Sequence, residues 1–313
     1  MTARVIVDCD NTMGKPYSEI DDGLTLLYLL GRGDIDLLGI TNCYANASLK
    51  DVEYWTDRFL HDIERTDIPR FSGKPFSNQN NTEWFRRTWG HHFTNERAAG
   101  QGSSAAAKFL AEQADKYRGQ LHVLALGSMT NLLEAWELDH GFFGKLKDIV
   151  LMGGVEPGTM LRGHSCLELN LACNPTAAHK VLHNGECRVV VMNAGTCLDA
   201  PFGLADMKRI SFWPERRKQM VREWIDVFEG TFYLWDLLPA VYLSCPELFD
   251  TSKARIVSTV TDLEQGILLK GEGGTEVSMP NHILDVAKFM EILVSAWRNA
   301  WTKEDQAWSK GQL

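Results

Sequence analysis

The segment VIVDCDNTMGKPYSEIDDGLTLLYLL, residues 5–30, decides the fold of this chain. Its first residues are almost continuously apolar, as in a strand covered on both faces of a parallel sheet. Asp8 and Asp10 stand where this strand ends, and Asp21 and Asp22 stand where the next apolar run begins a helix. Ligands of open parallel sheets bind at the carboxyl ends of the strands. The segment therefore predicts a strand–loop–helix unit with an acidic site at its turn.

The same alternation of short apolar runs and helical periods continues along the chain. Further buried strands are expected at residues 36–41, 121–126, 148–152 and 188–192. Helices are expected at residues 20–30, 105–117, 131–138 and 176–182. Asn131 and Glu134 are spaced like a capping pair at the start of one of these helices. The alternation predicts an α/β fold whose mainly parallel open sheet is flanked by helices.

The C-terminal part of the chain is mostly helical in pattern. Helices are expected at residues 213–229, 236–243 and 282–301, with a strand-like stretch at 254–279. Since there is no internal repeat and no Pro/Ser-rich linker, residues 1–313 are expected to form a single domain. Residues 72–102 lack a clear period and are expected to form a long loop, either functional or a disordered excursion.

Composition excludes several classes of protein. With 313 residues, 44% of them hydrophobic, the chain can bury a sizeable core, which excludes a disordered tail or a disulfide mini-protein. The 41 acidic residues outnumber the 32 basic ones, and the net charge of −9 argues against binding to nucleic acid. Seven scattered cysteines without a C-x-x-C pair do not indicate a zinc knuckle or a thioredoxin-like site. No signal peptide or membrane-spanning segment is recognisable, so a cytoplasmic protein without membrane contact is expected.

The four carboxylates of the opening segment are the first candidate site. Side chains of Asp8, Asp10, Asp21 and Asp22 brought to one place would repel one another unless a cation lay between them. Oxygen ligands in this number suit calcium or magnesium better than zinc. Asp21 and Asp22 alone could be favourable charges in the first turn of a helix. That alternative leaves Asp8 and Asp10 unaccounted for, so a metal or catalytic site is expected.

Two enzyme families share features of this opening. The sequence DCDNT (residues 8–12) fits the D-x-D-x-T motif of haloacid dehalogenase-like phosphatases, in which Asp8 would be the nucleophile. Such a phosphatase also needs a serine or threonine after a second strand, which Ser128 could supply. The late acidic pair that holds magnesium is missing, because residues 189–200 contain only Asp199. A phosphatase therefore remains an alternative.

The opening also resembles D-x-D-P-G-x-D-D-A of the nucleoside hydrolases of the inosine-uridine type, with a longer loop between Asp10 and Asp21. Five further segments resemble family segments in the same order: GITNCYANAS (39–48), LALGSMTNLLEA (124–135), DIVLMGGVEPG (148–158), LELNLACNPTAAHKVL (167–182) and WDLLPAVYLSCPELF (235–249). Together they cover nearly the whole chain. The resemblance implies a single nucleoside hydrolase-like domain that hydrolyses the N-glycosidic bond of ribonucleosides.

The resemblance also implies roles for individual residues. A calcium ion would be held by Asp10, Asp22, Asp236 and the backbone carbonyl of Leu126. Asp10 would double as the general base that activates water. Ribose hydroxyls would be bound by Asp21, Asn46, Glu168 and Asn170. A homo-oligomer, dimer or tetramer, is a further implication. An acidic pocket suits this reaction because cleavage builds positive charge on the sugar.

The chain departs from the family pattern around the base. Trp235 stands where many members have the histidine that protonates the leaving base. We expect Trp235 to stack on the base and favour purines over uridine, unless it only packs behind Asp236. His91 and His92 lie where the family has a histidine-bearing loop, and either could be the acid, although exposed loop histidines usually have no such role. These departures leave a non-catalytic nucleoside- or ribose-binding relative as another alternative.

Overall fold

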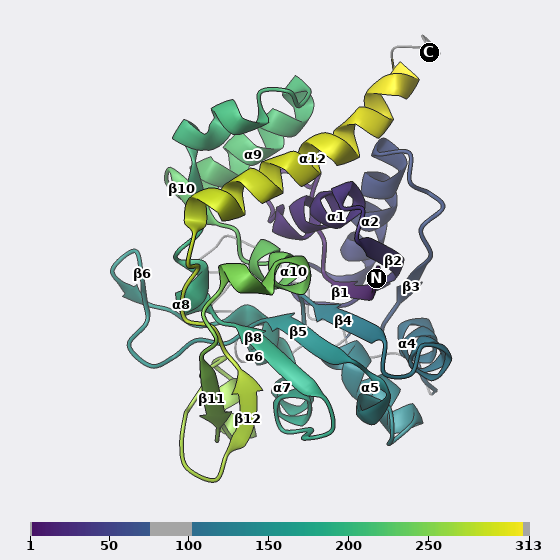
Figure 1. The fold of residues 1–313 in the computed structure, drawn as a ribbon, viewed down its shortest axis with the longest axis vertical. Helices are drawn as coiled ribbons and strands as arrows, with labels where there is room; N and C mark the ends of the chain where they lie inside the picture. Colours follow the sequence, from purple (N-terminus) through teal and green to yellow (C-terminus); the bar gives the residue numbers. More distant parts are fainter. Residues whose placement is uncertain (1, 76–101, 309–313) are drawn as a thin grey trace.

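An eight-stranded sheet forms the centre of the fold (Figure 1). The structure, a computed structural model, describes residues 2–75 and 102–308, of which 301–308 only as backbone. In spatial order the strands are β11 (Lys253–Ile256), β12 (Thr275–Ser278), β8 (Arg188–Met192), β5 (Asp148–Met152), β4 (Leu121–Ala125), β1 (Ala3–Cys9), β2 (Ile35–Asn42) and β3 (Arg70–Ser72). Neighbouring strands are parallel apart from β11, which runs antiparallel to β12. The predicted mainly parallel α/β sheet is confirmed.

Strand β1 shows why the apolar runs predicted buried strands. Val5 and Val7 pack into a core cluster on one face of the sheet, and Ile6 packs into the cluster on the opposite face. All three side chains are fully buried. A strand enclosed in this way needs apolar residues at successive positions, which is the pattern in the sequence.

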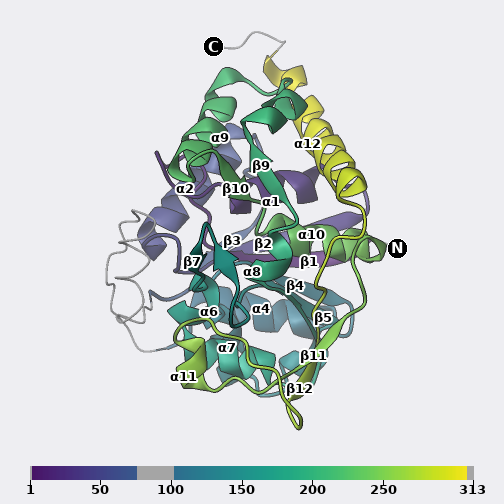
Figure 2. The ribbon, with the colours of Figure 1, turned by 90° about the vertical axis from the view of Figure 1, so that its left-hand side faces the viewer.

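Helices cover both faces of the sheet. One layer holds α1 (Asp21–Gly31), α2 (Leu49–Asp62), α9 (Glu215–Val227), α10 (Leu237–Ser244) and α12 (Val286–Trp308). The opposite layer holds α4 (Ala105–Lys116), α5 (Thr130–Leu138) and α7 (Pro175–Leu182). The two layers lie above and below the sheet in Figures 1 and 2. No helix among the described residues is both long and apolar enough to cross a membrane.

Smaller elements complete the described chain. They are α6 (Leu169–Cys173), α8 (Ala194–Cys197), α11 (Val260–Leu263), the hairpin of β6 (Met160–Leu161) and β7 (His164–Ser165), and the pair of β9 (Pro201–Gly203) and β10 (Thr231–Tyr233). Short 3-10 helices lie at Phe143–Lys145, Leu204–Ile210 and Pro246–Leu248. Helix α2 was not anticipated from the sequence, although Ser48 caps it by accepting a hydrogen bond from the N–H of Asp51.

The predicted capping pair of Asn131 and Glu134 is wrong. Helix α5 already begins at Thr130, and no side chain caps its N-terminus. The amide of Asn131 instead donates to Oδ1 of Asp8 at 2.7 Å, and the carboxylate of Glu134 accepts from the hydroxyl of Ser104 at 2.6 Å. Both side chains therefore serve contacts with distant segments, which short-range spacing does not reveal.

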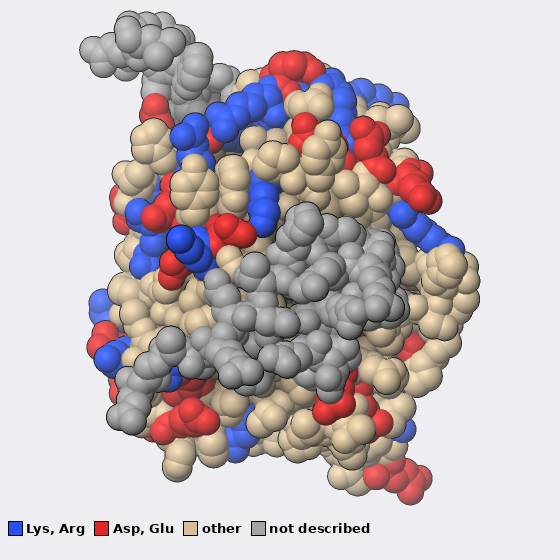
Figure 3. All heavy atoms as spheres, turned by 180° about the vertical axis from the view of Figure 1, so that it is seen from behind, with Lys and Arg blue, Asp and Glu red and all other residues tan. Residues whose placement is uncertain are grey.

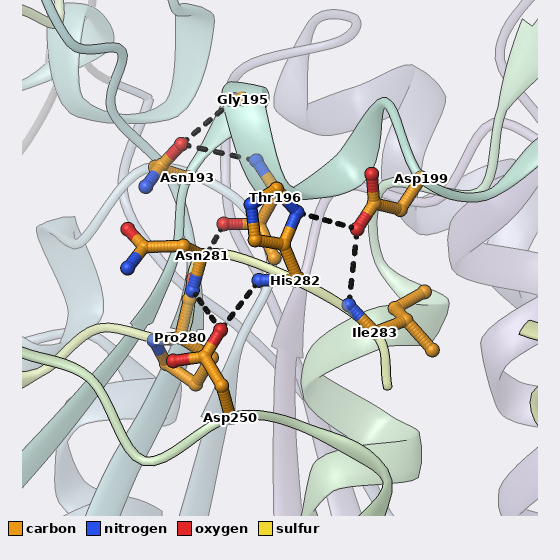
Figure 4. Close-up of polar contacts among 9 residues, drawn as sticks. All are labelled: Asn193, Gly195, Thr196, Asp199, Asp250, Pro280, Asn281, His282 and Ile283. Atoms are coloured by element: carbon orange, nitrogen blue, oxygen red, sulfur yellow. Dashed lines mark hydrogen bonds and ion pairs between the residues drawn. The ribbon is translucent and has the colours of Figure 1, made fainter. Parts of the chain in front are cut away.

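The segment that leads into α12 is fixed by two carboxylates (Figure 4). Asp250 accepts hydrogen bonds from the N–H groups of Asn281 and His282, at 2.8 and 2.7 Å. Asp199 accepts one from the N–H of Ile283 at 3.0 Å. Helix α12 begins only at Val286 and not at the expected His282, because Oδ1 of Asp285 caps it by accepting the N–H of Lys288 at 2.8 Å.

Candidate functional site

A cavity that is open to solvent lies at the carboxyl ends of the central strands. Leu126 follows β4, Met152 ends β5 and Ala194 follows β8, and all three line it. The other lining residues that carry polar groups are Glu19, Asn46, Cys166, Glu168, Asn170 and Asp236. None of the described lining residues is a lysine or an arginine. The cavity thus lies where ligands of open parallel sheets bind, and its titratable lining is acidic.

Asp8 lies behind this cavity in the interior. Its Oδ1 atom accepts hydrogen bonds from the hydroxyl of Thr41 at 2.6 Å and from the amide of Asn131 at 2.7 Å. Burial raises the pKa of Asp8 to about 7, although these two hydrogen bonds favour the ionised form. Asp8 is fully buried and does not line the cavity.

Asp10 is oriented by the next strand of the sheet. Its Oδ2 atom accepts the backbone N–H of Asn46 at 2.5 Å, whereas its buried Oδ1 atom has no partner. Burial raises the pKa of Asp10 to about 7. A Cβ atom at Gly127 would lie 3.1 Å from Cγ of Asp10 and 2.5 Å from Sγ of Cys43, so glycine is needed for this close approach. The free oxygen of Asp10 is therefore available to a ligand.

Three acidic residues lie close together where α1 begins, Glu19 in the preceding loop and Asp21 and Asp22 in the first turn. Glu19, Asp21 and Asp22 each present one carboxylate oxygen, and these three atoms lie within 4.8 Å of one another. Each residue also has a buried oxygen without a hydrogen-bond partner. Glu19 was not predicted as a site residue from the sequence, although it stands only two residues before Asp21 in the segment 5–30.

Asp236 reaches the same cluster from a distant part of the chain. It precedes α10, but its side chain does not cap that helix. Its backbone N–H donates to Oδ2 of Asp21 at 3.2 Å across 215 positions of sequence. The side chain of Asp236 is only 3% exposed and lines the cavity. Asp236 therefore occupies the N-cap position of α10, while its side chain belongs to the carboxylate cluster.

Five carboxyl groups, those of Asp10, Glu19, Asp21, Asp22 and Asp236, thus gather at one place. Burial raises the pKa of every one of them, and the charges of neighbouring members raise it further for Asp10, Glu19, Asp22 and Asp236. Such a group is costly when ionised without a cation. Its unpartnered oxygens are the ligand type that calcium and magnesium prefer. The residues present therefore fit a hard divalent cation.

The remaining polar residues predicted for the sugar surround this cluster. The amide of Asn46 donates to Oε2 of Glu19 at 2.5 Å, with Oδ2 of Asp22 at 3.5 Å. Asn170 donates to the carbonyl oxygen of Leu126 at 2.8 Å. Glu168 caps α6 by accepting the N–H groups of Asn170 and Leu171, at 2.6 and 2.9 Å. The side chains of Glu168 and Asn170 thus have a structural role at the cavity wall.

Aromatic residues also line the cavity. Trp224 and Phe228 come from the end of α9, and the half-buried Trp235 precedes α10. The guanidinium of Arg162 lies 4.8 Å from the ring centre of Phe228, which holds the β6–β7 hairpin near α9. The sequence indicated Trp235 but not Trp224 or Phe228. The two predicted candidates for the leaving-group acid, His91 and His92, lie outside the described residues.

The turn after β8 is held rigidly beside the cavity (Figure 4). Asn193 caps α8 by accepting the N–H groups of Gly195 and Thr196, at 2.7 and 3.2 Å. The hydroxyl of Thr196 donates to the carbonyl of Pro280 at 2.6 Å, which ties this turn to the segment before α12. Ala194 is thereby fixed in the cavity wall.

The charge distribution of the surface differs from that of the cavity. On the face shown in Figure 3, lysine and arginine side chains lie among aspartate and glutamate side chains over the described surface. The cavity, in contrast, collects acidic groups without a basic one among its described lining residues. A cation or a ligand that develops positive charge is the species such a cavity stabilises.

Comparison with known proteins agrees with this geometry. The sequence profile of the inosine-uridine preferring nucleoside hydrolases matches residues 5–295. Uridine nucleosidase 1 of Arabidopsis thaliana is 25% identical over 280 residues, covering 84% of this chain and 79% of the relative.

Two solved structures have the same fold. One is a plant nucleoside hydrolase, with a TM-score of 0.78 and 17% identity, and the other is a purine-preferring ribonucleoside hydrolase from Gardnerella vaginalis, with 0.77 and 19%. Each likeness covers 95% of this chain and 99% of the solved chain. Because the family profile matches almost the whole sequence, the chain is neither a haloacid dehalogenase-like phosphatase nor a non-catalytic relative. The chain therefore belongs to the inosine-uridine preferring nucleoside hydrolase family and is an enzyme of the nucleoside N-ribohydrolase type.

Proposed function

We propose that this enzyme hydrolyses the N-glycosidic bond of ribonucleosides with calcium as its cofactor. The observation that carries the proposal is the cluster of buried carboxyl groups at the strand ends, several with an oxygen that has no partner. The residues proposed to hold the ion are Asp10, Asp22, Asp236 and, through its carbonyl oxygen, Leu126. Bound calcium would supply a binding point for ribose hydroxyls and make the attacking water more acidic.

Asp10 is proposed as the general base. The N–H of Asn46 fixes one carboxylate oxygen of Asp10, so the other oxygen has a defined position from which to accept a proton. General-base catalysis requires such a fixed acceptor within hydrogen-bond reach of water. Asp8 does not suit this role, since Thr41 and Asn131 both donate to it in the interior.

The sugar is proposed to bind against the acidic wall. Asp21 and Asn46 would contact ribose hydroxyls next to the metal, and Glu168 and Asn170 would contact them from the cavity wall. Each carboxylate oxygen of Glu168 accepts one backbone N–H and keeps a further lone pair for a hydroxyl. The negative pocket would stabilise the positive charge that develops on the ribose as the bond breaks.

The base is proposed to lie against the aromatic wall. Trp235 is part of that wall together with Trp224 and Phe228, an arrangement suited to stacking on a planar ring. A purine offers the larger face, so we propose a preference for purine nucleosides. His91 and His92 remain the proposed sources of the proton for the leaving base. The named activities of relatives include both uridine and purine hydrolysis, so both classes of substrate must be tested.

We further propose that the chain is a cytoplasmic homo-oligomer, a dimer or tetramer, acting on a small-molecule nucleoside. All seven cysteines are free thiols, in accord with a reducing compartment. Size-exclusion chromatography with light scattering would give the number of subunits, and a single subunit would contradict this part of the proposal.

The deciding experiment is a substrate panel. Purified protein would be incubated with purine and pyrimidine ribonucleosides and their 2′-deoxy counterparts, with and without a chelator, and free base and reducing sugar would be measured. We expect equal amounts of base and ribose from ribonucleosides, and loss of both after chelation. Full activity after exhaustive chelation would refute the role of calcium, and no base release from any nucleoside would refute the proposed function.

A further inference from the structure

We infer that Glu19 is an additional ligand of the metal ion, supplied by the long loop between Asp10 and Asp21. The inference rests on the proposed function, in that it assumes a calcium ion in the carboxylate cluster. The position is absent from the motif that the chain resembles, because the residues between Asp10 and Asp21 form a longer loop here. This loop would therefore add a metal-binding group of its own.

The spacing of the oxygen atoms is the first argument. One oxygen each from Glu19, Asp21 and Asp22 lie within 4.8 Å of one another. Calcium–oxygen distances are about 2.3–2.6 Å, so two ligands of one ion can be separated by at most about twice that length. The three oxygens are therefore close enough to share a single ion.

Unsatisfied buried atoms are the second argument. Oδ1 of Asp21 and Oδ1 of Asp22 have no hydrogen-bond partner, and these side chains are 0% and 1% exposed. Oε1 of Glu19 is likewise buried without a partner. Buried carboxylate oxygens are costly when nothing contacts them. A cation bound by these three side chains would give such buried oxygens a partner.

The loop holds Glu19 in place for this role. The hydroxyl of Thr12 donates to the backbone carbonyl of Glu19 at 2.8 Å, and the ammonium of Lys15 pairs with Asp51 on α2 at 2.8 Å. The amide of Asn46 donates to Oε2 of Glu19 at 2.5 Å, which fixes the rotation of the carboxylate and leaves Oε1 free. Glu19 is thus a prepositioned ligand rather than a mobile surface residue.

A simpler reading assigns Glu19 to the helix dipole, since acidic residues are favourable near the start of a helix. That effect acts on exposed side chains as well, and it needs neither a buried oxygen nor a bond from Asn46. Asp21 and Asp22 already provide two charges in the first turn of α1. The simpler reading does not explain why Glu19 lines the cavity.

An added carboxylate has a consequence for ion selectivity. Calcium accepts roughly six to eight oxygen ligands in flexible geometry, whereas magnesium demands near-octahedral geometry and keeps several waters. Glu19 would therefore strengthen binding of calcium more than that of magnesium. This difference is a readout that does not depend on enzymatic activity.

The test is titration calorimetry of the metal-free full-length protein with calcium and then magnesium. We expect Glu19→Gln to weaken calcium binding about tenfold or more, with a smaller change for magnesium. Glu112→Gln is the matched control, because Glu112 is an exposed residue of α4, away from the cavity. Asp22→Asn is the positive control for the site. Glu19→Asp, which shortens the side chain by one methylene, should give an intermediate affinity.

The outcomes separate the two levels of the proposal. If wild-type protein binds no calcium, the proposed function fails together with the inference. If wild type binds calcium and Glu19→Gln binds it within twofold of wild type, only the role of Glu19 is overturned. Circular dichroism verifies the folding of each variant. Should Glu19→Gln fail to fold, Glu19→Asp decides, since unchanged affinity in that variant also overturns the inference.

Discussion

Asp8 and Asp10 stand two residues apart at the end of β1, yet their substitution by asparagine should have opposite consequences. Each has one buried oxygen without a partner, but Asp10 belongs to the cluster of five carboxyl groups, whereas Asp8 is bonded to Thr41 and Asn131 outside that cluster. We therefore expect Asp10→Asn to destroy activity with little effect on stability, and Asp8→Asn to reduce stability with little effect on activity. The two variants change the same number of atoms and the same charge, so each is a control for the other.

The expected loss of activity follows from the role of Asp10 as base. An asparagine can still accept the N–H of Asn46, but it cannot take a proton from water. Loss of a general base lowers the rate by about 10²–10⁴, and weaker metal binding adds to that factor. Without metal, removing one charge from a group of buried carboxylates relieves repulsion. The melting temperature of metal-free Asp10→Asn should accordingly equal or exceed that of wild type.

The expected loss of stability follows from the partners of Asp8. Its Oδ1 atom accepts two hydrogen bonds, at 2.6 and 2.7 Å, and such bonds to a charged group contribute about 1.5–3 kcal/mol each. In Asp8→Asn, the amide oxygen can still accept the bonds from Thr41 and Asn131. The amide nitrogen, however, takes the position of Oδ2, where its N–H groups find no partner. An unpaired N–H group costs about 1–3 kcal/mol. The uncharged asparagine also removes the cost of burying the Asp8 charge, which raises the pKa of Asp8. We therefore expect a net loss of about 1 kcal/mol. Since unfolding entropy is about 2.1 cal/mol/K per residue, this lowers the melting temperature by about 1.5 °C.

Both quantities are measurable on the same samples. Rates of base release with saturating calcium give kcat, and thermal unfolding at pH 8, where Asp8 is mostly ionised, gives the stability. Asp8→Asn should retain kcat within about tenfold of wild type. If folded Asp8→Asn lost more activity than folded Asp10→Asn, Asp8 would be the reacting group and the proposed division of roles would be wrong.

Three further predictions follow from the same structure. Elemental analysis of the purified enzyme should find about one calcium ion, and stoichiometric zinc would contradict this. In scanning calorimetry, the chelated protein should melt about 4 °C below protein kept at a free calcium concentration of about 100 Kd. Trp235→Ala should lower kcat/KM for inosine about tenfold while changing that for uridine less, because stacking contributes roughly 1–3 kcal/mol per base; an unchanged ratio would mean that Trp235 only packs behind Asp236. Burial alone would raise the pKa of Asp148, but hydrogen bonds and charge interactions with His122 and Arg188 outweigh it, so the pKa lies below its ordinary value of 3.8. Asp148→Asn should therefore destabilise the protein by about 2 kcal/mol above pH 4, with the difference from wild type shrinking as the pH falls below that value, as urea unfolding between pH 3 and pH 7 would reveal.

Much of the fold was accessible from the sequence. Strands enclosed on both faces need nearly continuous apolar residues, so β5 and β8 have the bounds expected from their sequence alone, and β1, β2 and β4 differ from expectation only at their ends. Helix α2 was missed although Leu49, Val52, Phe59 and Leu60 recur at helical spacing and form its buried face. The start of α12 was misplaced because the helix begins after Asp285, whose side chain caps it by accepting the N–H of Lys288.

The candidate site was accessible in part, through the rule that parallel strands bring their carboxyl ends to one edge of the sheet. That rule predicts that Asp10 lies close to Asp21 and Asp22, whereas Asn46 and Leu126 were implied only by the resemblance to a family. The resemblance to a family added Asp236, whose contact with Asp21 spans 215 positions and leaves no trace in local periodicity.

The sequence by itself determined the sheet, its helical layers and the acidic character of the strand ends, because these depend on patterns of neighbouring residues. The tertiary structure alone decided which carboxylates meet. It brought Glu19 into the cluster and turned Asn131 from a supposed capping residue to a partner of Asp8. It also made Trp224 and Phe228 a wall of the cavity. The physical reason is that hydrogen bonds and charge contacts act over a few ångströms in space, whatever the separation of the two residues along the chain.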